Sequence, residues 1–192
     1  MVRDGEASRR RLLMTATAEF ARYGIAGARV DRIAASAGVN KAQMYGWFGT
    51  KGDLFDAVFD DQLHRILDTV PFVAEDLPAY AVGLYDSYLT APELVRLASW
   101  NRLERVPEGA LLHGHDDLVQ PKYDAIAQAQ LEGRIVRDIR PEEVYALVIA
   151  LAGTWSPVSG TYTASALHDE ADHERRRAAL RLAVQRALVS SP

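Results

Sequence analysis

The chain has 192 residues, of which 48% are hydrophobic and 25% are charged, and it contains no cysteine. These proportions predict a folded globular protein and exclude disulfide bonds, thiolate-bound zinc, iron–sulfur clusters and cysteine nucleophiles. The first residues, MVRDGEASRRRLL, lack the apolar core of a signal peptide, and nowhere do about eighteen apolar residues follow one another. We therefore expect a soluble, cytoplasmic protein without a membrane partner.

The charge is distributed unevenly along the chain. The net charge is −4, but residues 1–51 hold nine lysines and arginines against four acids, a local charge of +5. The other 141 residues hold 13 basic and 22 acidic side chains, a charge of −9. A basic head on an acidic body predicts that only the head contacts a polyanion.

Hydrophobic residues recur at helical rather than strand spacing in almost every part of the chain. Gly24 is suited to end the first helix, because glycine readily adopts the left-handed conformation of a helix C-terminus. In the head and just beyond it, the spacing predicts helices over residues 7–23, 30–37 and 41–48 and from residue 51 to about residue 70.

The rest of the chain is also predicted to be helical. Asp76 and Pro78 mark one helix start, with the acid as N-cap and proline in the first turn. Residues 106–117 contain too many helix breakers and are predicted to form a loop. Further helices are predicted over residues 92–105, 118–132, 141–162 and 169–189. The prediction is an all-α fold with a small domain over residues 1–51 and a larger one over residues 52–192.

The stretch from residue 30 to residue 51, VDRIAASAGVNKAQMYGWFGTK, has the pattern of a helix-turn-helix. Gly38 supplies the positive φ of a sharp turn, and Asn40 with Gln43 matches a capping box at the next helix. Met44 and Phe48 are predicted to face inward. The outward side of that helix is then formed by Lys41, Ala42, Gln43, Tyr45 and Gly46. A helix in such an arrangement has the shape that enters a major groove.

The run FARYGIAGARVDRIAASAGVNKAQMYGWFGTKGDLFDAVF, residues 20–59, resembles the tetracycline-repressor (TetR) family of bacterial regulators. The resemblance covers about residues 8–60. It implies a homodimeric, ligand-responsive repressor that binds double-stranded DNA at a pseudo-palindromic operator through residues 1–51 and binds its effector through residues 52–192. We expect no enzyme, because the sequence has no phosphate loop, nucleophile motif or strong metal spacing. The alternative is a helical protein-interaction adaptor with a degenerate DNA-binding head.

Two places depart from the family pattern, Ala28-Arg29 before the first short helix and Gly46-Trp47 within the second. Arg29 is an expected substitute cation, and Gly46 either permits close approach to the DNA backbone or marks a weaker recognition helix. Gln43 could read adenine or serve only as a cap, and Tyr45 could contact a phosphate or pack. The predicted DNA contacts are Arg29, Asn40, Lys41, Ala42, Gln43, Tyr45, Gly46, Thr50 and Lys51, with Lys51 as a phosphate anchor.

Side chains of the body provide further candidates. Polar-tipped aromatic residues are suited to a pocket for an apolar or aromatic effector, although each could be ordinary packing; they are Tyr85, Tyr88, Trp100, Tyr123 and Trp155. Two apolar stripes could serve the internal core or, as the resemblance implies, a four-helix dimer interface. The first stripe is Val144, Val148 and Leu151, and the second is Leu180, Ala183, Val184 and Ala187.

The cluster His113, His115, Asp116 and Asp117 has metal-binding side chains but is interpreted as a loop, and neither a metal nor a cofactor is expected.

Overall fold

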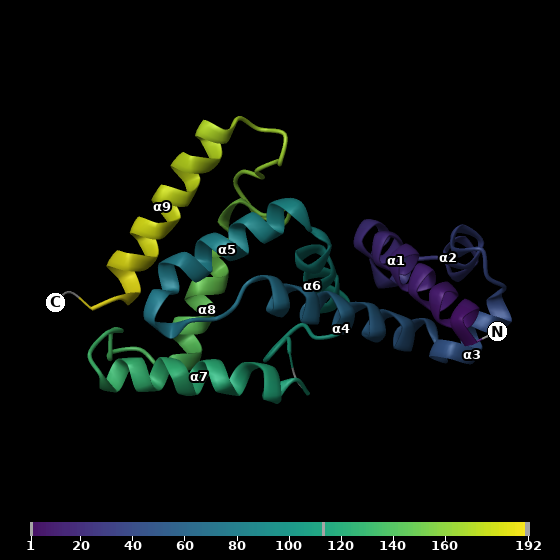
Figure 1. Ribbon diagram of the computed structural model, residues 1–192, viewed down its shortest axis with the longest axis horizontal. Helices are drawn as coiled ribbons and strands as arrows, with labels where there is room; N and C mark the ends of the chain where they lie inside the picture. The colour runs from purple at the N-terminus through teal and green to yellow at the C-terminus, as the bar shows by residue number, and fades with distance from the viewer. Residues whose placement is uncertain (1, 113, 191–192) are drawn as a thin grey trace. The chain divides into compact units, whose positions relative to one another are not determined.

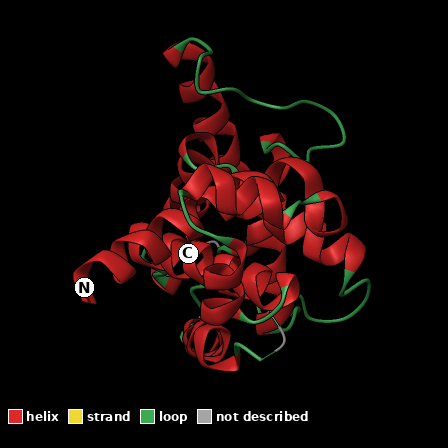
Figure 2. Cartoon of the chain, turned by 90° about the vertical axis from the view of Figure 1, so that its right-hand side faces the viewer, coloured by secondary structure: helices red, strands yellow, loops and turns green. Residues whose placement is uncertain are grey.

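A computed structural model describes residues 2–112 and 114–190 (Figure 1). Within them the regular structure is helical, apart from an isolated antiparallel bridge between Ile135 and Val189 (Figure 2). The all-α prediction is confirmed. The α-helices are α1 (Val2–Gly27), α2 (Val30–Ala37), α3 (Lys41–Phe48), α4 (Lys51–Thr69), α5 (Leu77–Thr90), α6 (Glu93–Glu104), α7 (Asp116–Leu131), α8 (Pro141–Ala152) and α9 (Glu170–Leu188), with short 3-10 helices η1 (Ala74–Asp76) and η2 (Gly153–Trp155).

The chain divides into two compact units, and the division differs from the predicted boundary at residue 51. The first unit comprises the chain up to Arg65 together with Glu93–Leu111, so it includes most of α4 and all of α6. The second comprises Ile66–Pro92 and the chain from Leu112 onward. The difference arises because α6, which lies far along the sequence, packs against α1.

The core of the first unit is aromatic and aliphatic. Phe20 of α1 and Phe55 of α4 are fully buried and meet edge to face, with ring centroids 5.3 Å apart. Phe59 stacks on Phe55 one helical turn further, at 6.1 Å. Ile33 of α2 and Met44 of α3 are also fully buried. Each helix of the head therefore contributes to one shared core.

The last turn of α1 is held by α6. Gly24 has φ 73° and ψ −179°, a conformation with positive φ but not the predicted left-handed one, and it kinks α1, which continues to Gly27 instead of ending there. Beyond it, the backbone N–H groups of Ile25 and Ala26 donate to the Glu104 carboxylate at 2.9 and 2.7 Å. Trp100 Nε1 donates to the Ala21 carbonyl at 3.3 Å, as does the Arg96 guanidinium at 2.9 Å. Helix α6 thus supplies the partners that this helix end lacks.

The second unit is built around α5, which packs against both α8 and α9, while α7 packs against α8 (Figure 1). Helix α5 begins as predicted, with Asp76 as its N-cap, because Asp76 Oδ1 accepts the Ala79 N–H at 2.9 Å. The helix predicted over residues 141–162 is too long. Helix α8 ends at Ala152, and the chain passes through η2 to Pro157, which cannot continue a helix. No helix in the described residues has the length and apolarity needed to cross a bilayer.

Candidate DNA-binding surface and ligand-binding body

Helices α2 and α3 have the predicted boundaries and form a helix-turn-helix. Gly38 ends α2 in the left-handed conformation with φ 68°, and its N–H donates to the Ala35 carbonyl at 3.2 Å. The Val39 N–H then donates to the Ala34 carbonyl at 3.0 Å. These two bonds close the C-terminus of α2 and turn the chain directly into α3.

Helix α3 buries one side and exposes the other. Met44 and Phe48 are buried, as predicted. Asn40 caps the helix by accepting the Gln43 N–H at 2.7 Å. The Gln43 amide forms no hydrogen bond to any described residue, so its side chain is available for an outside partner. The exposed residues are Lys41, Ala42, Gln43, Tyr45 and Gly46, of which Tyr45 retains 41% of its accessible surface.

Lys41 lies in the first turn of α3, where the helix dipole disfavours a cation. Its Nζ is 2.9 Å from Asp31 Oδ1 of α2, and the hydrogen bond and charge of Asp31 raise the pKa of Lys41. Both side chains are exposed, so the pair contributes little to stability. The protein itself thus supplies an anion beside Lys41, and contact with DNA would require Lys41 to exchange this partner.

Thr50 and Lys51 also have partners within the protein. The Thr50 N–H and hydroxyl donate to Asp53 Oδ2 at 2.8 and 2.7 Å, and these bonds lower the pKa of Asp53. Lys51 Nζ donates to the carbonyls of Ala26 and Ala28, both at 3.2 Å. Lys51 therefore stabilises the C-terminal end of α1, where a cation is favoured. The phosphate contact expected of Lys51 remains a prediction, and it would have to form alongside these two hydrogen bonds.

The N-terminus of α2 is capped from α1 by Glu19, a residue that sequence reasoning missed. Glu19 Oε1 accepts the Arg29 N–H at 2.8 Å, and its carboxylate also accepts from the Arg32 guanidinium. Burial opposes ionisation, but the bonds from Arg32 and Arg29 lower the pKa of Glu19 overall. The cap that is absent at Ala28-Arg29 is thus provided by a side chain ten residues earlier, and the Arg29 side chain stays exposed.

Gly46 has no structural requirement for glycine within the protein. A Cβ built at this position meets no atom within 4 Å. Replacing Gly46 by alanine should stabilise α3 by about 0.5–1 kcal/mol, because glycine is disfavoured inside helices. If Gly46 lies against a DNA backbone, the same variant binds operator DNA more weakly. Thermal unfolding of Gly46→Ala measures the gain in stability, and DNA-binding titration measures the loss of affinity. Greater stability with unchanged affinity would remove Gly46 from the contact surface.

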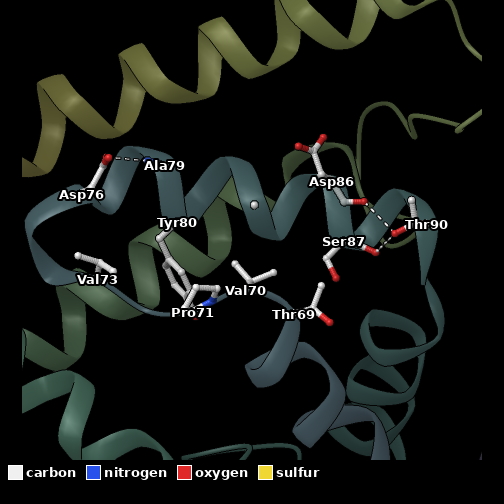
Figure 3. Close-up of a pocket in the computed structure, with 11 residues that line it drawn as sticks. Thr69, Val70, Pro71, Val73, Asp76, Ala79, Tyr80, Asp86, Ser87 and Thr90 are labelled. Atoms are coloured by element: carbon white, nitrogen blue, oxygen red, sulfur yellow. Dashed lines mark hydrogen bonds between the residues drawn. The ribbon is translucent and has the colours of Figure 1, made fainter.

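The second unit contains an open groove of about 600 Å³ between α5 and the segment that follows α4 (Figure 3). Tyr80 extends from α5 toward Pro71, and Val70 lies beside it (Figure 3). A Cβ at Gly83 would be 2.8 Å from a Val70 methyl, so glycine allows this close approach. The groove is lined by Thr69, Val70, Pro71, Val73, Asp76, Ala79, Tyr80, Gly83, Asp86, Ser87 and Thr90.

The five aromatic residues predicted for the effector pocket do not line this groove. Trp100 belongs to the first unit, where it packs against Gly24, and its role in an effector pocket stays a prediction. Tyr85 and Trp155 meet edge to face at 5.8 Å, whereas Tyr123 contacts Tyr145 at 5.8 Å. Tyr88 is buried. The aromatic residues of the second unit thus form separate contacts.

Sequence reasoning also missed a buried lysine in the second unit. Lys122 of α7 is 8% exposed, and its Nζ lies 3.3 Å from the Tyr145 hydroxyl and over the Tyr145 ring. Burial lowers the pKa of Lys122 and raises that of Tyr80, which contacts Tyr145. Lys122 follows a proline within a helix, and only its position on the inward side of α7 distinguishes it from a surface lysine.

Two family profiles match the chain. The profile described as "Bacterial regulatory proteins, tetR family" matches residues 12–58, and the one described as "Tetracyclin repressor-like, C-terminal domain" matches residues 76–186. The chain belongs to the TetR family of transcriptional regulators. The resemblance of the head is confirmed, and membership extends to the body.

Proteins and solved structures that are similar to the chain are described as transcriptional regulators. HTH-type transcriptional repressor SCO4008 of Streptomyces coelicolor is 36% identical over 160 residues, which is 81% of this chain and 81% of the relative. The structure of the transcriptional regulator SCO4942 from Streptomyces coelicolor matches with a TM-score of 0.77 at 32% identity, covering 94% of this chain and 98% of that one. A regulator from Saccharomonospora viridis, solved in complex with choline, shares the fold at a TM-score of 0.64 and 21% identity, covering 95% and 98% of the two chains.

The predicted dimer stripes of this TetR-family chain need correction. Four of the seven side chains are 0–2% exposed within a single protomer and therefore form its internal core: Val144, Val148, Leu180 and Val184. Of the others, Leu151 is half-buried, and Ala183 and Ala187 are exposed. The exposed apolar side chains of the same helices instead include Leu147 and Leu182, at 45% and 50% exposure.

The HGHDD segment can be described only in part. His113 lies outside the described residues. His115 precedes α7, and Asp116 and Asp117 form its first turn, where acids are favoured by the helix dipole. In the described residues, no group of three or more histidines and acids is arranged to hold a metal ion.

Proposed function

We propose that the protein is a ligand-responsive repressor that binds a pseudo-palindromic DNA operator as a homodimer and leaves it when a small molecule binds the second unit. The observation that carries the proposal is the side of α3 opposite Met44 and Phe48. It is exposed and polar, and it is held by a helix-turn-helix in a head of charge +5. Such a helix presents its N-terminal residues to a major groove.

Residues of α3 and at the start of α2 have separate roles in this proposal. The unpaired Gln43 amide is suited to read adenine through two hydrogen bonds. Arg29, Lys41 and the Tyr45 hydroxyl are suited to contact phosphates, which position the head without reading sequence. Asn40 holds the start of the helix. In a dimer, the two recognition helices would enter successive major grooves about 34–36 Å apart.

The DNA-binding proposal is tested with the full chain on random duplex DNA across a salt series. Binding should weaken steeply between about 50 and 200 mM salt, because phosphate contacts release counterions. Fluorescence anisotropy measures the affinity. Absence of binding to any duplex at low salt would contradict the proposal and favour the adaptor alternative.

Gln43→Ala should change base preference at one position in each half-site. A bidentate amide contact contributes about 1–3 kcal/mol of discrimination against the wrong base. Selection from a randomised duplex pool measures the preference, with Gln128→Ala on α7 as the matched control. An unchanged preference profile for Gln43→Ala would leave Gln43 without a role in reading sequence.

Dimerisation is proposed through the exposed sides of α8 and α9. These sides present Ala146, Leu147 and Ala150 on one helix and Ala179, Leu182 and Ala183 on the other, all outside the protomer core. Exposed apolar residues on two adjacent helices of one unit are suited to a four-helix interface.

The double variant Leu147→Glu, Leu182→Glu should therefore be a folded monomer, because burying a carboxylate without a partner in an interface is strongly unfavourable. Light scattering coupled to size exclusion measures the mass. Leu167→Glu is the control, since Leu167 is 94% exposed and lies outside both helices. A double variant that remains dimeric would place the interface elsewhere.

The groove beside α5 is the proposed effector site. Its volume of about 600 Å³ falls in the range of pockets for small organic molecules. Its apolar lining at Val70, Pro71 and Tyr80 favours an apolar or aromatic effector. Asp76 and Asp86 are already engaged, as helix cap and as partner of Arg177. Effector and operator must weaken each other's binding by the same factor, because such coupling is reciprocal.

A further inference from the structure

A second group of polar side chains lies apart from the groove, between α5 and the start of α9. Tyr85 of α5 and His173 and Arg176 of α9 form this group, which we term the Arg176 cluster. The Tyr85 hydroxyl is 2.7 Å from His173 Nδ1, and both side chains are buried. The Arg176 guanidinium lies over the Tyr162 ring at 5.3 Å, with Nη2 3.5 Å from the Tyr162 hydroxyl.

The hydrogen bond between Tyr85 and His173 determines which ring nitrogen of His173 can donate. Burial raises the pKa of the Tyr85 hydroxyl, which favours the protonated form that can donate a hydrogen bond. When Tyr85 donates to His173 Nδ1, Nδ1 is the acceptor of the neutral ring and Nε2 carries the hydrogen. In this tautomer the cluster presents His173 Nε2–H as a donor.

Two donors of this cluster have no partner in the described residues. His173 Nε2 and Arg176 Nη1 are both inaccessible to solvent and form no hydrogen bond. His173 as a whole is 4% exposed. A buried donor without a partner costs about 1–3 kcal/mol, and more when the group is charged. A third buried atom without a partner is Ser156 Oγ, which follows Trp155 where that ring meets Tyr85.

The charge of Arg176 is also unbalanced, in contrast to its neighbours along α9. Arg175 pairs with Asp172. Arg177 pairs with Asp86, Glu170 and Glu174. No ion pair joins Arg176 to an acid in the described part of the chain, although its Nη1 is buried. Arg176 is half-buried, and its buried Nη1 together with His173 Nε2 could donate to the two oxygens of a carboxylate.

The surroundings of the Arg176 cluster are aromatic. Trp155 packs edge to face on Tyr85, and His168 stacks on His173 with ring centroids 6.3 Å apart. Tyr162 contacts His168 at 6.0 Å. Tyr85 and His173 are buried, whereas Tyr162 is 49% exposed, so the cluster is only partly shielded from water. Partial shielding strengthens hydrogen bonds to a charged ligand. The aromatic rings also provide apolar contacts for the part of a ligand that carries the acid group.

We propose that the Arg176 cluster is a binding site for the carboxylate of a small organic acid, with Arg176 Nη1 and His173 Nε2 as its donors. None of the residues that line the groove belongs to the cluster, so this is a second ligand site in the body. Tyr85 is a positioning residue, because its hydroxyl bonds to Nδ1 of His173 and so favours the tautomer with hydrogen on Nε2.

The test uses the full chain without DNA, so its result does not depend on operator binding. Calorimetric titration with sodium benzoate and with benzamide compares an acid with a neutral molecule of the same shape. The expected result is saturable binding of benzoate in the millimolar range or tighter, and binding of benzamide weaker by at least about tenfold, because charge-assisted hydrogen bonds are the stronger ones. In parallel, the ¹⁵N resonance of His173 Nε2 should shift with benzoate and saturate at the same concentration.

Arg176→Gln should weaken benzoate binding by at least about tenfold, since it removes the charge from the stronger of the two donors. Arg175→Gln is the matched control and should keep the affinity within about twofold, because a surface ion pair contributes little. Circular dichroism verifies that both variants are folded. Failure of benzoate to saturate, equal affinity for benzamide, or unchanged affinity of Arg176→Gln would each overturn the proposal.

Discussion

Gly24→Ala is expected to destabilise the first unit by about 2–4 kcal/mol, because strain at a positive φ adds to the loss of a buried cap. The new Cβ would lie 2.5 Å from Glu104 Oε1 and 3.0 Å from two atoms of the Trp100 ring. Displacing the Glu104 carboxylate removes the acceptor of the Ile25 and Ala26 N–H groups. At this chain length, the midpoint of thermal unfolding should fall by about 5–15 °C.

Calorimetric unfolding measures this change, and Gly27→Ala is its matched control. Gly27 lies three residues later in the same helix, and a Cβ there would make only an ordinary contact, 3.4 Å from Tyr23 Cβ. The control should therefore unfold close to the temperature of the unaltered chain. Equal midpoints for both variants would mean that α6 does not constrain the end of α1. DNA binding by Gly24→Ala should weaken in parallel, since α1 supports α2 and α3.

Phe55→Ala is expected to cost about 3–5 kcal/mol, the range for a large aromatic side chain removed from a core. Phe55 is fully buried and contacts both Phe20 and Phe59. Because all three belong to the first unit, the loss should be confined to that unit. Hydrogen exchange should show loss of protection in α2 and α3, while α7 and α8 remain protected.

Phe72→Ala is the reciprocal control, because Phe72 packs edge to face on Tyr80 within the second unit, with centroids 5.0 Å apart. It should reduce protection in the second unit and leave α2 and α3 protected. Parallel loss of protection in both units, from either variant, would show that the chain unfolds as one cooperative body and would contradict the division into two units.

The boundaries of α2 and α3 could be predicted because they depend on short-range chemistry. Gly38 and Asn40 determine where one helix ends and the next begins, and both act within four residues along the chain. The inward direction of Met44 and Phe48 follows from helical spacing alone. For the same reason the family resemblance of this segment was visible in the sequence, before any tertiary contact was known.

Contacts distant in sequence could not be predicted in this way. The bond from Trp100 to the Ala21 carbonyl joins residues 79 positions apart, and no periodicity signals it. The sequence therefore places Trp100 in the body, whereas its contacts place it in the first unit. The stripe that includes Val144 and Val148 illustrates a second limit, because a buried core and a dimer interface select the same apolar spacing. Only the exposed fractions distinguish these residues from Leu147.

The dependence of α1 on α6 determines when the head becomes stable during synthesis of the chain. The last turn of α1 depends on the Glu104 carboxylate, yet α1 is synthesised long before α6. A nascent chain that has just exposed α1–α4 therefore holds all of the residues proposed to contact DNA but lacks the helix that completes their support. The head should acquire its native stability only after α6 leaves the ribosome, when α5 has also been synthesised. Operator binding by unfinished chains is thereby disfavoured by the topology itself.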